Sequence, residues 1–391
     1  MIGRKQIVIL GCLLMIGLAG LCGCGSPSSD SMERVGTEAD HAADVPGDLT
    51  YESSMELQYA KNFSVDDYEG GYKILKTMDG TQILVVPEEK EVPDGIGKDV
   101  VVVKQPVKNL YVVSSSIMDI FSKLDAMDTI RLSGQKEEDW YVQDAKDAMS
   151  RGDILYAGKY SKPDYELIVS ENCSLAIENT MITHSPEVSE MLADFDIPTM
   201  IEYSSYESHP LGRVEWVKFF GALIGKDELA QKIFNEEVRL VDEVTSVEKT
   251  DKTVAFFYVT SNGLIQVRSS SDYVPKMISL AGGNYIPTNI GDPDSKRSTV
   301  SMQIEDFYDQ AKDVDFIIYN SSIDGGIGSV QGLLDKCAVL KDFKAVKEGN
   351  VWCTTNDMYQ QSMSIGYLIH DMHAMLQGKD QDEMTYLFHV E

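Results

Sequence analysis

One stretch, residues 203–213, gathers side chains that could hold a small molecule. It reads Tyr-Ser-Ser-Tyr-Glu-Ser-His-Pro-Leu-Gly-Arg. Tyr206 could stack on a flat ligand, Arg213 could bind a carboxylate or a catecholate, and His209 could coordinate a metal. Plainer roles are also open. His209 could be a hydrogen-bonded loop histidine, and Arg213 could pair with Glu215 to hold the loop.

Five more side chains could reach a ligand because they lie in or beside loops of the predicted lobes, most of them after predicted strands. Ligand crevices of parallel sheets lie at the carboxyl ends of the strands. The candidates are Ser115, Asn179, Tyr258, Arg297 and Tyr359. Arg297, on a loop rich in Gly, Asp and Ser, could face an anionic ligand or remain a solvated side chain.

Metal binding and catalysis find little support in the residue pattern. His370 and His373 are three residues apart on a predicted helix, but no third ligand follows nearby. Asp292 and Asp294 lack the glycine and the spaced carboxylates of a calcium loop. The motifs G-x-S-x-G, H-E-x-x-H and G-x-x-x-x-G-K-[ST] are absent from the sequence. We therefore expect a protein that is not an enzyme and has no metal site of its own.

The charge and the cysteines narrow the function further. A formal charge of −29 over 391 residues argues against nucleic acid or an anionic membrane surface as the partner. Three cysteines lie beyond the N-terminal region, at Cys173, Cys337 and Cys353. Their odd number and wide spacing predict neither a disulfide framework nor a CxxC metal site.

The N-terminus has the pattern of a processing signal. Arg4 and Lys5 precede an apolar run, residues 7–21, that is short for a membrane span. The following Leu-Cys-Gly-Cys resembles a bacterial lipobox. Cys24 is the best candidate for lipidation, because Cys22 lacks a small residue before it. A plain secretory signal is the alternative.

The elements that must position these side chains centre on residues 227–247. Apolar residues recur there at spacings of three and four, which predicts a helix roughly 30 Å long. Asp227 is placed to cap it. Strand and helix patterns alternate on both sides of this helix, which favours largely parallel sheets. Glu166 and Glu305 occupy matching places, since each begins a helix that leads to a buried strand ending in Asn, at Asn179 or Asn320.

The predicted fold class is α/β, with two lobes of mainly parallel sheet flanked by helices. A single long helix connects the lobes, and an N-terminal β-hairpin module with an Asp79–Gly80 turn precedes them. The expected segments are a signal peptide at 1–23, a flexible tether at 24–50, a β extension at 51–106, the first lobe at 107–225, the connecting helix at 226–248 and the second lobe at 249–391.

Several of these segments together resemble one family, the class III substrate-binding proteins of ABC importers, of the iron-siderophore and cobalamin type. The resemblance covers roughly residues 105–380. It rests on Tyr111–Val113 with its serine loop, Pro163-x-x-Glu166-x-Ile168, Ile197-Pro198, Gly221 to Ala230, Glu305 ahead of Asp315-Phe-Ile-Ile, and Phe343-Lys-Ala-Val-Lys-x-Gly-Asn-Val351. It implies a monomer outside the cytoplasm, held at the membrane by the lipid on Cys24.

The resemblance also implies partners and a ligand. The cleft between the lobes would hold an iron-siderophore, haem or corrinoid, and Glu166 and Glu305 would dock onto arginines of the permease. No cofactor is expected to be covalently attached apart from the lipid. Two alternatives stay open. One is a receptor for free zinc, manganese or iron with similar architecture, and the other is a surface lipoprotein without a transport role.

Overall fold

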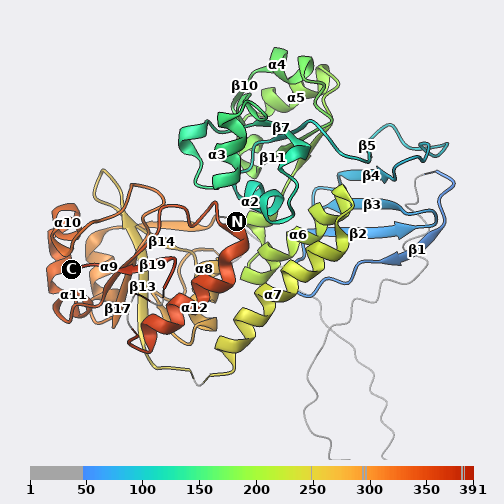
Figure 1. Ribbon diagram of the computed structural model, residues 1–391. Helices are drawn as coiled ribbons and strands as arrows, with labels where there is room; N and C mark the ends of the chain where they lie inside the picture. The colour runs from blue at the N-terminus through green and yellow to red at the C-terminus, as the bar shows by residue number, and fades with distance from the viewer. Residues whose placement is uncertain (1–46, 248, 293–294, 296, 380–381, 383) are drawn as a thin grey trace, which may run out of the picture. The chain divides into compact units, whose positions relative to one another are not determined.

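Three large β-sheets, with helices packed against them, make up the described part of the chain (Figure 1). The computed structural model describes residues 47–247, 249–292, 295, 297–379, 382 and 384–391. These residues belong to one unit, Asp44–Glu391. The predicted signal peptide, Cys24, most of the tether and Asp294 lie outside the described residues. In the described part, no helix combines the length and the apolar character needed to cross a membrane.

The first sheet lies in the predicted N-terminal extension and has five strands in chain order. They are β1 (Tyr51–Ser54), β2 (Phe63–Tyr68), β3 (Tyr72–Thr77), β4 (Gln82–Val86) and β5 (Val100–Lys104). The Asp79–Gly80 turn joins β3 to β4, and Gly80 has a φ of 90°, which glycine adopts without a side-chain clash. The predicted hairpin is therefore present, but as part of a larger sheet whose last pair is parallel.

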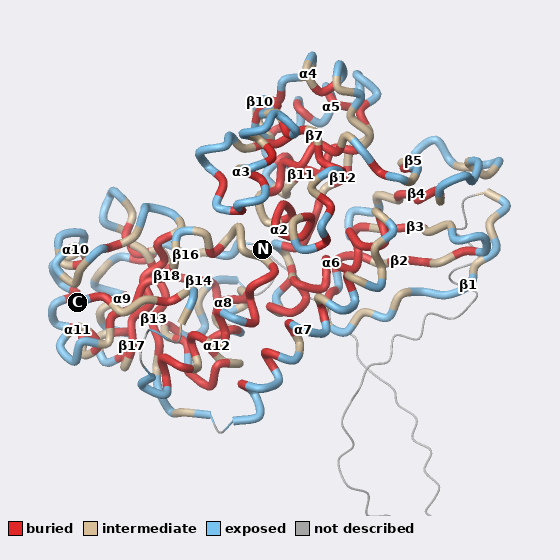
Figure 2. The backbone as a smooth tube through the Cα atoms, viewed as in Figure 1, coloured by how far each residue is buried: buried red, intermediate tan, exposed pale blue. Residues whose placement is uncertain are grey.

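The second sheet is entirely parallel, in the order β12-β11-β6-β7-β8. Its strands are β6 (Leu110–Val112), β7 (Ile130–Ser133), β8 (Leu155–Tyr156), β11 (Leu175–Glu178) and β12 (Thr199–Ile201). Strands β6 and β11 are buried at every position, as is typical of parallel strands covered by helices, and Figure 2 shows the region around β11 in red. The accompanying helices are α2 (Ser115–Lys123), α3 (Gln143–Ser150), α4 (Tyr165–Ser170), α5 (Pro186–Asp194) and α6 (Pro210–Ile224).

The third sheet is mixed rather than mainly parallel. Its path runs β16-β14-β13-β17-β18-β19, with β15 also pairing with β13. The strands are β13 (Thr253–Val259), β14 (Ile265–Arg268), β15 (Asn284–Ile286), β16 (Thr299–Met302), β17 (Phe316–Tyr319), β18 (Val351–Thr354) and β19 (Leu387–His389). The pairs made by β14, β16 and β19 are antiparallel. The helices are α8 (Tyr273–Leu280), α9 (Ile304–Ala311), α10 (Val330–Lys336), α11 (Lys344–Lys347) and α12 (Ile365–Leu376).

Short segments complete the chain. Two-residue strands β9 (Gly158–Lys159) and β10 (Lys162–Pro163) pair with each other. The 3₁₀ turns are η2 (Met127–Thr129), η3 (Glu137–Asp139), η4 (Thr180–His184), η5 (Ser204–Tyr206), η6 (Ala338–Asp342) and η7 (Ser362–Ser364).

Helix α7 (Asp227–Thr245) lies in the chain between the second and third sheets. It packs against α6 and α12. Gly221 permits the close approach to α6, since a Cβ there would lie 2.4 Å from the Cβ of Ala230. The prediction that Asp227 caps the helix is wrong. Lys226 holds that position, and the Asp227 carboxylate lies 3.1 Å from Lys73 Nζ in the first sheet.

Two buried glutamates fasten the N-terminal extension to α6 and the loop before it. Glu215 accepts hydrogen bonds from the backbone N–H groups of residues 58–60, at 2.8–3.2 Å. Glu207 accepts from those of Lys61 and Asn62. Five consecutive backbone donors are thus satisfied by two carboxylates, which fixes the loop between β1 and β2.

Candidate functional site

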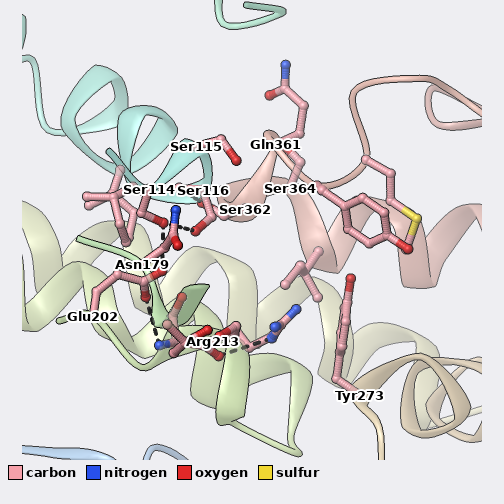
Figure 3. A pocket seen from close by; sticks show the side chains of 18 of the residues that line it. Ser114, Ser115, Ser116, Asn179, Glu202, Arg213, Tyr273, Gln361, Ser362 and Ser364 are labelled. Atoms are coloured by element: carbon pink, nitrogen blue, oxygen red, sulfur yellow. Dashed lines mark hydrogen bonds between the residues drawn. The ribbon is translucent and has the colours of Figure 1, made fainter. Parts of the chain in front are cut away.

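A cavity of about 540 Å³ is lined by residues that precede α7 and by residues that follow it. Those preceding it are Ser114–Ile117, Ile120, Asn179–Met181, Glu202, Ser204, Ser205 and Arg213. Those following it are Tyr273, Ile323, Met358, Tyr359, Gln361, Ser362, Ser364, Ile365, Leu368 and Tyr386. Figure 3 shows the cavity from close by. Its size and mixed lining suit a small organic ligand.

The wall at the strand ends is built from hydroxyls around one buried carboxylate. The Ser114 hydroxyl donates to Glu202 Oε1 at 2.6 Å, and the Ser204 backbone N–H donates to Glu202 Oε2 at 2.8 Å. Ser114 precedes α2 and also lies 3.2 Å from the Ser116 hydroxyl (Figure 3). Because Glu202 follows β12 and Ser114 follows β6, the parallel sheet itself brings them together.

Arg213 brings a positive charge to the cavity. Its Nε donates to the Ser204 carbonyl at 3.1 Å, and its guanidinium lies 3.8 Å from the centre of the Tyr273 ring (Figure 3). No salt bridge among the described residues includes Arg213. The alternative pairing with Glu215 is not what the structure shows, because Glu215 binds backbone amides and lies 2.9 Å from Lys218 Nζ. The outer nitrogens of Arg213 therefore remain suited to an anionic group.

Tyr359 presents a hydroxyl whose acceptor capacity is already used. Asn320 Nδ2 donates to it at 2.8 Å, and Arg268 Nη1 donates at 3.3 Å. Arg268 is itself buried and held by both carboxylate oxygens of Asp272. A phenol oxygen that accepts two hydrogen bonds still has its own proton to donate. Tyr359 is thus set to donate to an acceptor atom of a ligand.

The start of α12 forms another wall, and two buried carboxylates hold it. Asp119 on α2 accepts from the Met363 N–H at 2.7 Å, and Glu237 on α7 accepts from the Gly366 N–H at 2.7 Å. Burial raises the pKa of Asp119 to about 6 and that of Glu237 to about 7. These bonds tie α12 to helices that precede it, and they fix the cavity-lining Ser364 between the two bonded amides.

Four of the predicted ligand residues line this cavity: Ser115, Asn179, Arg213 and Tyr359. Tyr206 and Arg297 instead line a neighbouring pocket. Tyr258, on β13, lines neither of these two pockets. Asn179 also caps η4 by accepting from the Met181 N–H at 2.9 Å.

His209 has a structural role in this arrangement. Its Nδ1 accepts from the Leu211 N–H at 3.2 Å at the start of α6, and its ring stacks on Tyr59 with centroids 4.5 Å apart. Burial, followed by the positive charges of Lys276 and Lys61, lowers its pKa to about 4. The interpretation as a hydrogen-bonded loop histidine describes this geometry better than the interpretation as a cavity ligand.

The sequence-based predictions missed several residues of the cavity. Glu202 and Tyr273 gave no signal in the sequence that could have identified them as cavity residues. Arg268, which donates to Tyr359 but does not itself line the cavity, was missed because β14 was not predicted. Among the described residues, no group of three or more His, Cys, Asp or Glu side chains could hold a metal ion. His373, one of the two helix histidines, lies with Nδ1 2.9 Å from the Ala281 carbonyl.

Glu178, at the end of β11, is fully buried beside the cavity residue Asn179. Neither carboxylate oxygen has a hydrogen-bond partner within the described part of the chain. Burial raises its pKa to about 8, so the neutral acid dominates at pH 7. Burial is also the main reason why the pKa values of Tyr111 and Cys173 are raised, and the nearby Glu178 carboxylate adds to both shifts.

Comparisons with known proteins indicate relatives without an assigned activity. No family model matches the sequence. One uncharacterized lipoprotein of Methanocaldococcus jannaschii is 22% identical over 91% of this chain and 89% of its own length. A second from the same organism is 23% identical over 99% of this chain and its whole length. Both relatives are named lipoproteins, and the lipobox-like pattern at the N-terminus of this chain predicts a lipoprotein as well.

Solved structures share the fold. The periplasmic heme-binding protein HutB of Vibrio cholerae matches 67% of this chain and 97% of its own, with a TM-score of 0.55 and 13% identity. A periplasmic binding protein of Veillonella parvula matches 84% of this chain and 99% of its own, with a TM-score of 0.56 and 13% identity. The chain therefore has the mixed α/β fold of periplasmic binding proteins.

The Veillonella match also bears on the N-terminal extension. Residues 107–391 make up less than three quarters of the chain. A match to 84% of it must therefore include part of the residues before 107. The extension is thus not peculiar to this chain.

Proposed function

We propose that the protein is the extracytoplasmic substrate-binding component of an ABC importer, anchored by a lipid on Cys24. It captures an iron-siderophore, haem or corrinoid and delivers it to the permease. One observation carries the proposal: a cavity of about 540 Å³ lies in a fold shared with periplasmic binding proteins and is lined from both sides of α7.

The parallel second sheet and the mixed third sheet form the two lobes in this proposal, and α7 is the single helix that connects them. The contacts of α7 with α6 and α12 support a stiff connection. The carboxylates of Asp119 and Glu237, which hold the start of α12, support it as well. We expect the lobes to rock only modestly when a ligand enters, with the protein acting as a monomer.

The lining favours a chelate over a bare metal ion. Among the described residues, no histidine or cysteine lines the cavity, and the carboxylate that does, Glu202, already accepts two hydrogen bonds. Free zinc, manganese or iron would require several such donors. Arg213 and the Tyr359 hydroxyl instead suit acidic or acceptor groups on the periphery of a chelate. The apolar lining, such as Met358 and Leu368, suits its organic surface.

Glu166 and Glu305 would dock on the permease in this proposal. Each is exposed in the first turn of a helix, α4 or α9, and no salt bridge within the described residues includes either. Arginines of a permease could therefore pair with them without first breaking an internal pair.

Analysis of the co-purified ligand tests the proposal. The chain from residue 25 onward would be produced under iron-replete conditions and examined by absorbance, mass spectrometry and elemental analysis. Thermal unfolding would then be followed with ferric citrate, ferrichrome, haemin and cobalamin. A ligand at about 100 times its Kd adds about 2.7 kcal/mol of stability, which raises the melting temperature by a few degrees.

The outcomes separate the three candidate functions. A shift with one chelate, lost in Arg213→Ala, supports the proposal. Bound zinc, manganese or iron without an organic ligand would favour the metal-ion receptor. No shift with any probe would favour a surface lipoprotein without a transport role.

A further inference from the structure

A second pocket, of about 280 Å³, adjoins the main cavity, because Ser205 lines both. Three parts of the chain build it. Lys61 and Asn62 come from the N-terminal extension, Ser205–Ser208 from the loop before α6, and Ser271, Asp272, Ser295, Arg297 and Ser298 from the region after α7. The pocket therefore gives the N-terminal extension a direct place beside the ligand cavity.

The two carboxylates in this pocket are already satisfied. Glu207 accepts from the backbone N–H groups of Lys61 and Asn62 and from Trp216 Nε1. Asp272 is bound by Arg268 through both oxygens and caps α8 by accepting from the Val274 N–H. Asp272 is therefore neutralised by Arg268, and Glu207 directs its oxygens to backbone amides and to Trp216 rather than to a cation of the pocket.

Its two cations, in contrast, have no acidic partner within the described part of the chain, where no salt bridge includes Lys61 or Arg297. The positive charge is also felt by His209, whose pKa burial lowers first and Lys276 and Lys61 lower further. In a chain with a formal charge of −29, a small pocket that brings together two exposed cations, each outside any salt bridge of the described residues, favours an anionic occupant.

Hydroxyl groups supply the remaining polar lining. Ser205, Ser208, Ser271, Ser295 and Ser298 all contribute to it. A serine hydroxyl can donate to an oxygen acceptor, and lysine and arginine donate with a positive charge. Such a set matches the several acceptor oxygens of a carboxylate or a phosphate.

We propose that this second pocket is an oxyanion subsite. Its occupant is a carboxylate arm of the ligand in the main cavity or a free phosphate ion. The first source rests on the proposed function, whereas the second does not. Lys61 is a specificity-determining residue of this subsite, and the Glu207 bond to its backbone N–H fixes the main chain from which its side chain extends.

Two titrations at constant ionic strength test the subsite, with inorganic phosphate and with ferric citrate as the probes. Lys61→Ala and Arg297→Ala remove the cations one at a time. Lys98→Ala is the matched control, because it removes an exposed lysine of the same extension outside the pocket. Losing one charge-assisted contact should weaken binding about tenfold, while Lys98→Ala should bind like the unaltered chain.

The two probes distinguish the sources. Phosphate binding that weakens in Lys61→Ala but not in Arg213→Ala identifies a site for a free anion. This conclusion would hold even if the protein has no role in transport. Ferric citrate binding that weakens in both Lys61→Ala and Arg213→Ala identifies the occupant as a carboxylate arm of the ligand. Equal affinity of Lys61→Ala, Arg297→Ala and the unaltered chain for both probes would overturn the subsite even if ferric citrate binds in the main cavity. If neither phosphate nor ferric citrate binds, the proposed subsite is also overturned.

Discussion

The guanidinium of Arg213 lies 3.8 Å from the centre of the Tyr273 ring, although α6 and α8 are separated in the chain by the whole of α7. Burial raises the pKa of Tyr273 to about 12, so the ring stays neutral at pH 7. A cation–π contact holds the arginine without neutralising it, unlike a salt bridge. Arg213 is therefore both positioned and available to an anionic ligand.

Replacing Arg213 should lower ligand affinity. The ligand for this test is a chelate that raises the melting temperature of the unaltered chain. Arg213→Ala is expected to lower the affinity for it about tenfold or more, because a charge-assisted contact is lost. Arg213→Lys should recover only part, because a lysine lacks the planar group that stacks on Tyr273. Isothermal titration would measure this, with Arg151→Ala, an exposed arginine beside Asp153, as the control. Equal affinities of the unaltered chain, Arg213→Ala and Arg213→Lys would contradict a role of Arg213 in ligand binding.

Tyr359→Phe should weaken binding while leaving the fold intact. The change removes one donor from the cavity and leaves Asn320 Nδ2 without its acceptor, so we expect about a tenfold loss of affinity and a stability loss of about 1–3 kcal/mol. Titration calorimetry and urea unfolding would measure the two effects. Tyr367→Phe on the exposed face of α12 is the control. Unchanged affinity would show that the hydroxyl does not contact the ligand.

Glu215→Gln should loosen the N-terminal extension. The glutamine keeps an acceptor for the backbone amides of residues 58–60 but leaves the buried Lys218 without its counter-charge. Removing one partner of a buried pair costs about 3–5 kcal/mol. Urea unfolding would give the loss, and proteolysis would be expected to cut within the extension, residues 51–106, earlier than in the unaltered chain. Glu236→Gln, in an exposed pair with Arg239, should change neither measurement.

Glu178 should make stability depend on pH. Its pKa is raised to about 8 in the fold from a usual value of 4.5, so the folded chain binds a proton more tightly than the unfolded chain. Its contribution is fully present below about pH 4.5 and is lost as the pH rises through 8, with a slope of at most about 1.4 kcal/mol per pH unit.

Glu178→Gln removes this contribution. The raised pKa values of Asp119 and Glu237 also make stability depend on pH, but equally in the variant and in the unaltered chain, so their effect cancels in the difference. Urea unfolding between pH 5 and 9 should therefore show the variant gaining stability relative to the unaltered chain as the pH rises. A difference that does not vary with pH would mean that Glu178 titrates near its usual pKa.

Charge reversal at Glu166 and Glu305 should abolish uptake and leave ligand affinity unchanged. The two side chains are exposed and neither lines the cavity, so the double variant Glu166→Lys and Glu305→Lys should bind the chelate normally. Transport into cells or proteoliposomes is the readout. The control reverses Glu138 and Glu348, which are also exposed. Normal transport by the variant that carries both Glu166→Lys and Glu305→Lys would refute the docking assignment.

Much of the secondary structure followed from local pattern. The helical spacing of residues 227–247, the helix starts at Glu166 and Glu305 and the Asp79–Gly80 turn all correspond to observed elements. Each is encoded within a few residues, where periodicity and turn chemistry act. The placement of polar residues after strands also predicted four side chains of the cavity, because parallel strands end at one edge.

What tertiary structure decided was which polar side chains are already occupied by others. His209 and Arg213 lie four residues apart and were both candidates for a ligand, yet one caps α6 against Tyr59 and the other lines the cavity. The matching Asn179 and Asn320 likewise differ, since one lines the cavity and the other supports Tyr359. A sequence pattern fixes the periodicity of an element. The partners of its polar groups can come from distant segments, 39 residues away for Asn320 and Tyr359 and 88 residues away for Ser114 and Glu202, and only folding brings them within hydrogen-bond distance.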